Sequence, residues 1–335
     1  MSYHYAPIMS VVITLVIISA ILTHRNKEAI QDMPNERSLH TLPVPRIGGM
    51  AIVLGIVAGW SVMWSQVVWW IVLPMLILFA VSLRDDLKGV PIRWRLLTHI
   101  VAASLLVFGS GLVEQNVALA FLVLLCAVWM INLYNFMDGA DGLAGGMTAM
   151  GFFMYGMAGL MHDSIQQAML NFTIGVAALG FINYNFHPAK LFMGDCGSIP
   201  LGFLAAAMAL WGWQLGMWPA WFPLLVFSPF IMDASVTLIK RTLQRKRIWE
   251  AHRAHYYQRL ILMGWGHDKL AWYSYALMFP VGVSALWALH LSSTSVGLLF
   301  LFWGGVYAAL MRVVDSRWKI FQLSQNVQPQ NDQPT

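Results

Sequence analysis

The sequence predicts an all-α integral membrane protein with about 11 transmembrane helices. Of its 335 residues, 59% are hydrophobic and only 10% are charged, whereas soluble domains carry roughly a quarter charged residues. The apolar residues form continuous runs that are long enough to cross a bilayer, which takes about 20 residues in a helix. These runs lack the alternation of transmembrane barrel strands, so helices are expected.

Eleven apolar runs are candidate spans. The first has no small-residue cleavage site and no preceding positive charge, so we interpret it as a retained helix rather than a signal peptide. We expect one polytopic domain over residues 1–320 and a disordered cytoplasmic tail, rich in Gln and Asn, over residues 321–335. The runs lie near residues 8–23, 48–64, 67–83, 97–112, 117–134, 142–161, 167–184, 199–214, 220–239, 270–290 and 295–312.

The positive charges predict the orientation of these helices. When the connections are assigned alternately to the two sides of the membrane, one side receives all 20 Lys and Arg residues. Because positively charged connections stay in the cytoplasm, we expect the N-terminus outside and the C-terminus inside the cell. The connections on the cytoplasmic side are residues 24–46, 84–95, 185–198, 240–269 and 312–335.

Cysteine content and charge narrow the classes of function. The two cysteines, Cys126 and Cys196, form neither a disulfide framework nor a metal-binding spacing. The pI near 9.3 arises from the cytoplasmic connections, which suits anionic lipid headgroups and phosphorylated substrates. No aromatic and basic RNA-binding motif accompanies it, so nucleic acid is not an expected partner.

Five polar stretches fall on the predicted cytoplasmic side. Acidic residues at the edge of an apolar span are costly to insert and are therefore candidates for function. Since the five stretches face the same surface, we expect them to form one site. They are PNERSLHTLPVPRIGG (34–49), RDDLKG (84–89), NLYNFMDGADG (132–142), NYNFHPAKLFMGDCGS (183–198) and EAHRAHYYQ (250–258).

The acids in these stretches suit a hard cation and a phosphate. Asp85 and Asp86 are adjacent, so on a helix their side chains diverge by about 100°. Asp138 and Asp141 are three residues apart and would lie on one helical face. Asp195 precedes a span whose first amides and dipole favour an anion such as phosphate. Carboxylates are usual ligands of Mg²⁺, which bridges to substrate phosphates, so we expect phosphoryl transfer.

In combination these motifs resemble a known enzyme family. RDDLKG, NLYNFMDGADGLAGG and NFHPAKLFMGDCGS are similar to the signatures of the polyprenyl-phosphate N-acetylhexosamine-1-phosphate transferases, of the glycosyltransferase family 4 type. The resemblance runs from about Pro34 to His267. It implies a multi-pass protein of the bacterial inner membrane with a periplasmic N-terminus and a cytoplasmic active site.

The same resemblance implies a reaction and its partners. The expected reaction transfers a sugar 1-phosphate from a UDP-N-acetylhexosamine to undecaprenyl phosphate and releases UMP. The implied cofactor is Mg²⁺, with Mn²⁺ as an alternative ion. The expected partners are these two substrates and the lipid bilayer. The resemblance does not decide whether the protein forms a homodimer.

The resemblance also assigns roles to residues. Asp195 matches the principal Mg²⁺ ligand. Asp85 and Asp86 match paired catalytic aspartates, the first as a base for the lipid phosphate and the second as a support for the metal or the diphosphate. Asp233 matches a recurrent acid without an assigned role. The remaining matches are the nucleotide-binding residues Asn132, Asn135, Asp138, Asp141, Asn185 and Phe192, and the diphosphate-binding residues Arg46, His252, Arg253 and His255.

One departure from the family pattern, in the histidine segment, indicates which branch of the family the chain resembles. Many relatives carry a histidine cluster where this chain has the sequence HRAH at residues 252–255, and the muramoyl-pentapeptide branch has a histidine triplet. The HRAHYYQ form resembles the branch that initiates O-antigen, which accepts N-acetylglucosamine or N-acetyl-6-deoxyhexosamines such as FucNAc and QuiNAc. The implied product serves lipopolysaccharide O-antigen or a related glycan in cell wall biogenesis.

Two other function classes compete with this interpretation. A transporter could use membrane acids to carry ions, but it predicts internal repeats and acids at mid-membrane depth, whereas these acids cluster at the cytoplasmic edge. A CDP-alcohol phosphotransferase also has Asp-Gly acids. Its pattern requires Ala-Arg shortly after the first Asp-Gly, and here Ala140-Asp141-Gly142 follows.

Overall fold

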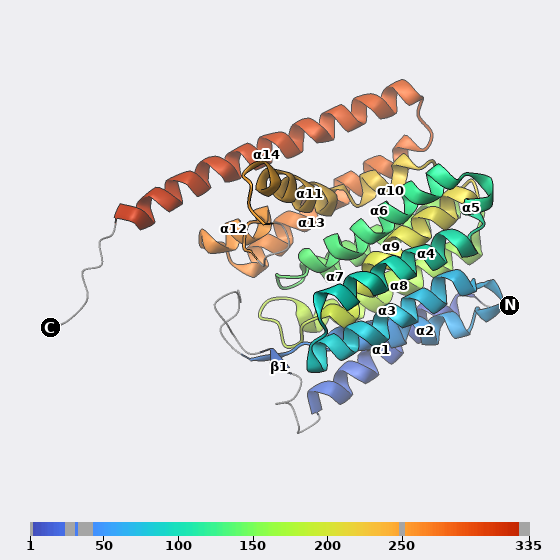
Figure 1. The fold of residues 1–335 in the computed structure, drawn as a ribbon. Helices are drawn as coiled ribbons and strands as arrows, with labels where there is room; N and C mark the ends of the chain where they lie inside the picture. Colours follow the sequence, from blue (N-terminus) through green and yellow to red (C-terminus); the bar gives the residue numbers. More distant parts are fainter. Residues whose placement is uncertain (1–2, 24–30, 33–42, 248–251, 328–335) are drawn as a thin grey trace.

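The computed structural model describes residues 3–23, 31–32, 43–247 and 252–327, and within them it shows a bundle of helices (Figure 1). One short antiparallel pair joins β1 (Gln31–Asp32) to β2 (Val44–Pro45). The helices are α1 (Tyr5–Thr23), α2 (Gly48–Ser61), α3 (Trp69–Lys88), α4 (Ile92–Gly109), α5 (Leu112–Gln115), α6 (Val117–Phe136), α7 (Leu143–Met161), α8 (Ile165–Asn185), α9 (Asp195–Gln214), α10 (Trp221–Val226), α11 (Ser228–Leu243), α12 (Tyr256–Leu262), α13 (His267–Ala288) and α14 (Ser293–Val327).

The apolar helices agree with an all-α membrane protein. Among the described residues, eight helices are long and apolar enough to cross a bilayer, namely α1, α4, α6, α7, α8, α9, α13 and α14. Helices also occupy the other predicted ranges, but α2 has only 14 residues and α3 ends in the charged sequence RDDLK. The total number of crossings and the side on which each terminus lies remain predictions.

The predicted single helix over residues 220–239 is wrong. The structure divides it into α10, which ends at Val226, and α11, which begins at Ser228. Pro229 is the second residue of α11 and has no N–H to donate to the preceding turn, so the helical hydrogen-bond ladder is interrupted there. α11 therefore starts as a separate helix, and it carries Asp233 among its buried residues.

The helix α9 lies at the centre of the bundle and packs against α2, α3, α6 and α7. Small residues allow these helices to approach closely, as is usual between membrane helices. A Cβ atom added to Gly49 of α2 would lie 2.1 Å from the main-chain nitrogen of Gly197 in α9. The crossing of α2 and α9 therefore requires a residue without a side chain at position 49.

The described parts of the predicted cytoplasmic connections lie at one end of the bundle, on the left in Figure 1. The helices α3, α6 and α8 end there, and α4, α7, α9 and α13 begin there (Figure 1). The acidic motifs, which sit at these helix ends, are thus placed at the same end of the molecule. This arrangement is what positions the candidate site.

The longest helix, α14, has 35 residues and packs against α12 and α13 on the outside of the bundle (Figure 1). Large apolar side chains on it are exposed, as Leu301 is at 73%, which suits a surface that faces lipid. α14 continues to Val327, past residue 320, after which we place the tail. Residues 328–335 lie outside the described residues.

Replacing Gly49 by valine should destabilise the protein. The added carbons would overlap the backbone of Gly197, and overpacking of this kind costs roughly 1–3 kcal/mol. We expect the melting temperature of the detergent-purified protein, followed by tryptophan fluorescence, to fall by about 5 °C or more. Gly305→Val on α14 is the matched control, because a Cβ there meets no described atom within 4 Å. Equal losses in both variants would contradict the packing argument.

Candidate active site at the charged end of the bundle

The Asp86 side chain binds the N-terminus of α9. Its carboxylate accepts hydrogen bonds from the main-chain N–H groups of Asp195 (3.1 Å) and Cys196 (2.8 Å). An anion is stabilised here because the first amides of a helix have no partner within the helix and the helix dipole is positive at this end. The sequence predicts a phosphate at these amides. The structure corrects this expectation, because the anion at these two amides is Asp86.

The Arg95 side chain connects Asp85 to Asp195. Arg95 lies in the first turn of α4, and its guanidinium nitrogens are 2.9 Å from Asp85 Oδ2 and 2.6 Å from Asp195 Oδ2. The other oxygen of Asp85 accepts the N–H of Val90 at 2.6 Å. Asp85 and Asp86 therefore face different partners, as expected for neighbours on a helix. Sequence reasoning missed Arg95, and its signal is the RWR that follows RDDLKG.

The last turn of α6 is tied to α9 by an asparagine. Asn135 Nδ2 donates to Asp195 Oδ1 (2.7 Å) and to Ser198 Oγ (3.1 Å). Asn132, almost one turn earlier, donates to the main-chain oxygen of Val128 at 2.7 Å. Of the two predicted nucleotide-site asparagines in α6, only Asn135 therefore contacts the acidic residues through its amide nitrogen in this structure.

The expectation that Asp138 and Asp141 share a helical face is wrong. α6 ends at Phe136 and α7 begins at Leu143, so both acids lie in the turn between these helices. Gly142 closes the turn with φ of 76°, a left-handed conformation that glycine adopts without steric cost. The two side chains diverge, since Asp138 lies near Asp195 and Asp86 and Asp141 contacts two histidines.

The acidic residues fit a divalent cation. Burial, together with the negative charges of Asp195 and Asp86, raises the pKa of Asp138 well above its ordinary value. Burial makes the larger contribution to this shift, and the neighbouring carboxylates of Asp195 and Asp86 add to it; a divalent cation beside them would oppose that second contribution. Oxygen ligands of this kind are those that Mg²⁺ prefers. Asp195 and Asp86 are the candidate ligands.

The segment around Arg46 is paired with the segment before α9. Arg46 donates through Nε to the main-chain oxygen of Asp86 at 3.1 Å. Phe192 N–H donates to Pro45 O at 2.7 Å, and Gly48 N–H donates to Phe192 O at 2.8 Å. Gly194, with φ of 72°, passes so close that an added Cβ would lie 2.0 Å from Arg46 O. Arg46 and Phe192 are therefore positioned beside the acids by main-chain contacts.

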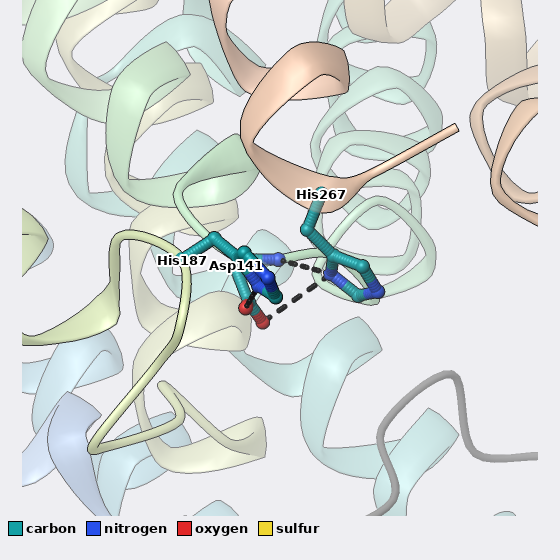
Figure 2. A group of neighbouring side chains, drawn as sticks. All are labelled: Asp141, His187 and His267. Carbon is teal, nitrogen blue, oxygen red and sulfur yellow. Dashed lines mark hydrogen bonds and ion pairs between the residues drawn. The ribbon is translucent and has the colours of Figure 1, made fainter. Parts of the chain in front are cut away.

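Three side chains from distant segments meet beside the α6–α7 turn (Figure 2). Asp141 Oδ2 is 2.7 Å from His187 Nδ1, and Asp141 Oδ1 is 3.4 Å from His267 Nδ1. The imidazole rings of His187 and His267 are stacked, with centroids 5.4 Å apart. The structure thus places Asp141 with two histidines that sequence reasoning did not select. Their only sequence signals are the HP of NFHPAK and the histidine that starts α13.

The Asn185 side chain is buried and holds two loops together. Its Oδ1 accepts the N–H of Gly142 and its Nδ2 donates to Leu191 O, both at 2.9 Å. Tyr275 Oη donates to Gly142 O at 2.7 Å from α13. Asn185 therefore fixes the α6–α7 turn against the segment that carries Phe192.

The Asp233 carboxylate anchors the histidine loop, which is residues 252–255 before α12. It accepts the N–H groups of Tyr256 (2.9 Å) and Tyr257 (3.0 Å), and it lies 3.2 Å from Nδ1 of the buried His255. Tyr257 Oη in turn donates to the last carbonyl of α6, that of Phe136, at 2.9 Å. The loop is thereby held next to the turn that carries Asp138.

The predicted diphosphate residues His252, Arg253 and His255 all belong to this loop. Burial, followed by the charges of His255, Arg241 and Arg259, lowers the pKa of His252 to about 4. His252 is therefore neutral near pH 7 and can act through hydrogen bonds rather than charge. The ring of His255 packs on Phe136, with centroids 5.9 Å apart.

Most of the predicted site residues thus form three adjoining groups, which include neither Asn132 nor Phe192. The acidic group contains Asp85, Asp86, Asn135, Asp138 and Asp195, with Arg46 and Arg95 beside it. Asp141 and Asn185 belong to a second group that includes His187, His267 and the α6–α7 turn. His252, Arg253 and His255 form the third, which Asp233 and Tyr257 join to the end of α6.

Comparison with known proteins shows which enzymes the chain is similar to. Residues 68–213, which span α3 to α9, match the family model described as Glycosyl transferase family 4. The chain is 27% identical over 297 residues to a probable undecaprenyl-phosphate N-acetylglucosaminyl 1-phosphate transferase of Bacillus subtilis, covering 83% of each chain. It is 29% identical to a decaprenyl-phosphate N-acetylglucosaminephosphotransferase of Mycobacterium tuberculosis, covering 71% of this chain and 70% of the other.

A third similarity is to a phospho-N-acetylmuramoyl-pentapeptide-transferase of Staphylococcus epidermidis, which is 30% identical over 52% of this chain and 54% of its own. The fold is that of a polytopic membrane protein with acidic residues gathered at one end of the bundle. These matches support the resemblance seen in the sequence: the chain is similar to polyprenyl-phosphate N-acetylhexosamine-1-phosphate transferases.

Replacing Asp233 by asparagine should loosen the histidine loop. An uncharged amide weakens two main-chain hydrogen bonds, and hydrogen bonds to charged groups contribute about 1.5–3 kcal/mol each. We expect a melting temperature lower by about 5 °C or more and faster hydrogen exchange at the amides of Tyr256 and Tyr257. Asp163→Asn, an exposed acid in the α7–α8 turn, serves as the control. Unchanged exchange in Asp233→Asn would refute the anchoring role.

Proposed function

We propose that this protein transfers an N-acetylhexosamine 1-phosphate from a UDP-sugar to undecaprenyl phosphate and releases UMP. The observation that carries the proposal is the convergence of Asp85, Asp86, Asp138 and Asp195 at the N-terminus of α9. These acids lie at one end of the bundle, not at the mid-depth that an ion carrier requires. The similar enzymes are named for reactions with a polyprenyl phosphate.

A Mg²⁺ ion held by Asp195 and Asp86 would neutralise charge on the diphosphate, and Mn²⁺ is the alternative ion. The protein's own part is to hold the carboxylates in place before substrate arrives. Asn135 and Arg95 fix the two oxygens of Asp195, and the α9 amides fix Asp86. Positioned charges of this kind supply most of the acceleration in phosphoryl transfer.

Asp85 is the proposed base for the lipid phosphate. A carboxylate has roughly four lone-pair positions, and the contacts with Arg95 and Val90 use two of them. Asp85 can therefore accept a proton from the acceptor phosphate while it stays fixed by Arg95. Arg95 is in turn positioned to keep Asp85 and Asp195 at a constant separation.

The nucleotide and diphosphate are proposed to bind between the three groups of residues. Asn132, Asn135, Asp138 and Phe192 would contact the nucleotide, while Asp141 and Asn185 shape its turn. The proposed diphosphate-binding residues are Arg46, His252, Arg253 and His255. Because the pKa of His252 is lowered to about 4, this residue would donate a hydrogen bond from a neutral ring.

The proposed chemical step is a direct displacement. An oxygen of the lipid phosphate attacks the β-phosphorus, which carries the sugar. A new P–O bond forms as the bond from the β-phosphorus to the bridging oxygen breaks, and UMP leaves with that oxygen. The alternative is a two-step route in which an aspartate attacks first and forms a phospho-aspartyl intermediate.

The donor sugar is proposed to be N-acetylglucosamine or an N-acetyl-6-deoxyhexosamine such as FucNAc or QuiNAc. Two similar enzymes are named for N-acetylglucosamine, and the HRAHYYQ segment supports the O-antigen branch. The product would then initiate lipopolysaccharide O-antigen or a related surface glycan. We place the enzyme in the bacterial inner membrane, with the charged end in the cytoplasm.

A donor panel tests this function. Purified protein in detergent, with Mg²⁺ and undecaprenyl phosphate, should release UMP from at least one of UDP-GlcNAc, UDP-GalNAc, UDP-FucNAc and UDP-QuiNAc, measured by chromatography. The preferred donor should differ from the others by one or two hydroxyl contacts with the protein, so its kcat/KM should be about 10-fold higher or more. UMP release that requires no acceptor would favour the covalent route. No release from any donor would overturn the proposed function.

Replacing Asp195 by asparagine should abolish UMP release. The substitution removes a charge at the centre of the acidic group, and loss of one positioned electrostatic contact typically lowers kcat about 100-fold or more. Expression and melting temperature should stay close to those of the wild-type protein. Asp268→Asn, an exposed acid in the first turn of α13, should keep full activity. Retained turnover in Asp195→Asn would exclude this residue as a metal ligand.

A further inference from the structure

The trio of Asp141, His187 and His267 differs chemically from the acidic group. It offers two imidazole nitrogens and one carboxylate, whose ligand atoms all lie within 4.8 Å of one another. The three side chains point toward one another from three separate segments (Figure 2). Such a set suits Zn²⁺ and similar transition-metal ions, which bind imidazole well, whereas Mg²⁺ prefers oxygen ligands alone.

The hydrogen bonds around His267 give the second observation. The main-chain N–H of Asp141 donates to His267 Nδ1 at 3.2 Å, so this nitrogen is an acceptor and the ring proton is on Nε2. The same nitrogen is 3.4 Å from Asp141 Oδ1. His267 Nδ1 is therefore unprotonated, as a metal ligand must be, and a bound cation would take the place of the Asp141 N–H at its single lone pair.

The three side chains differ in their exposure to solvent, and the site is accessible from the side of the most exposed one. The side chains of Asp141 and His267 are 8% and 11% exposed, while that of His187 is 43% exposed. Two ligands are thus held by packing, and Ala189 N–H further orients the Asp141 carboxylate at 3.3 Å. An ion can enter beside His187, and water can complete the coordination there, since zinc is usually four-coordinate.

We propose that Asp141, His187 and His267 bind one Zn²⁺ ion, separately from the Mg²⁺ of the acidic group. The ion would join the α6–α7 turn, the α8–α9 connection and the first residue of α13. Asp141 is 46 residues from His187 and 126 from His267, so binding would cross-link distant parts of the chain. It would also fix the turn that presents Asp138. This proposal does not rest on the transferase activity.

Zinc binding can be measured without an activity assay. The full-length protein in detergent is treated with chelator and then titrated with Zn²⁺ by calorimetry, in excess Mg²⁺ to occupy the acidic group. We expect one Zn²⁺ per chain, confirmed by elemental analysis, and a higher melting temperature with Zn²⁺. His187→Ala and His267→Ala should each weaken binding at least about 10-fold, and the double variant should show neither effect.

Matched controls separate this site from other histidines. His290→Ala, beyond the C-terminus of α13, and His252→Ala, in the histidine loop, should bind zinc like the wild-type protein. Because a double variant can fail to fold, Co²⁺ added to the wild type gives an independent test through the visible absorption of nitrogen-ligated cobalt. The proposal is overturned if the wild type binds no zinc and shows no cobalt spectrum. It is equally overturned if the folded double variant binds zinc as well as the wild type.

Discussion

The carboxylate of Asp86 and the first amides of α9 form the contact on which the charged end depends. It places a negative charge at the positive end of a helix dipole, and each hydrogen bond to such a charge contributes about 1.5–3 kcal/mol. It also joins α3 to α9, the helix around which the bundle packs. Since Asp86 occupies these amides, the Asp195 side chain is turned toward Arg95 of α4 and Asn135 of α6. One contact therefore sets the separation of the carboxylates.

The α6–α7 turn divides the polar end into two chemical environments. Asp138 faces carboxylates and belongs to an oxygen-rich group, while Asp141 faces two imidazoles. Gly142 follows the two acids and takes a left-handed conformation just before α7, which glycine adopts without steric cost. The main-chain N–H and C=O of Gly142 are then held by Asn185 and Tyr275. The same short motif thus serves two groups of side chains.

Contacts from α11, α12 and α14 hold the residues that follow the histidine loop in place. Tyr256 donates its N–H to Asp233 of α11, and its hydroxyl lies 3.3 Å from Asp315 of α14. Asp315 also pairs with Arg259 of α12 at 2.9 Å. The Arg259 side chain is 14% exposed and that of Asp315 is 29% exposed, so the pair is partly shielded from water and is worth more than a fully exposed surface pair. α14 therefore contributes to the placement of the loop that carries His252 and His255.

The sequence by itself determined the membrane class, the ranges of most helices, the gathering of positive charge in alternate connections and the resemblance to a family. Hydropathy, charge and motif spacing are local properties, so they can be read along the chain. Tertiary structure decided which anion occupies the start of α9, the different partners of Asp138 and Asp141, and the contacts of Arg95, His187 and His267. Asp86 lies 109 residues from Asp195, and partners so distant meet only because the helices pack in one particular order. Local patterns contain no information about that order.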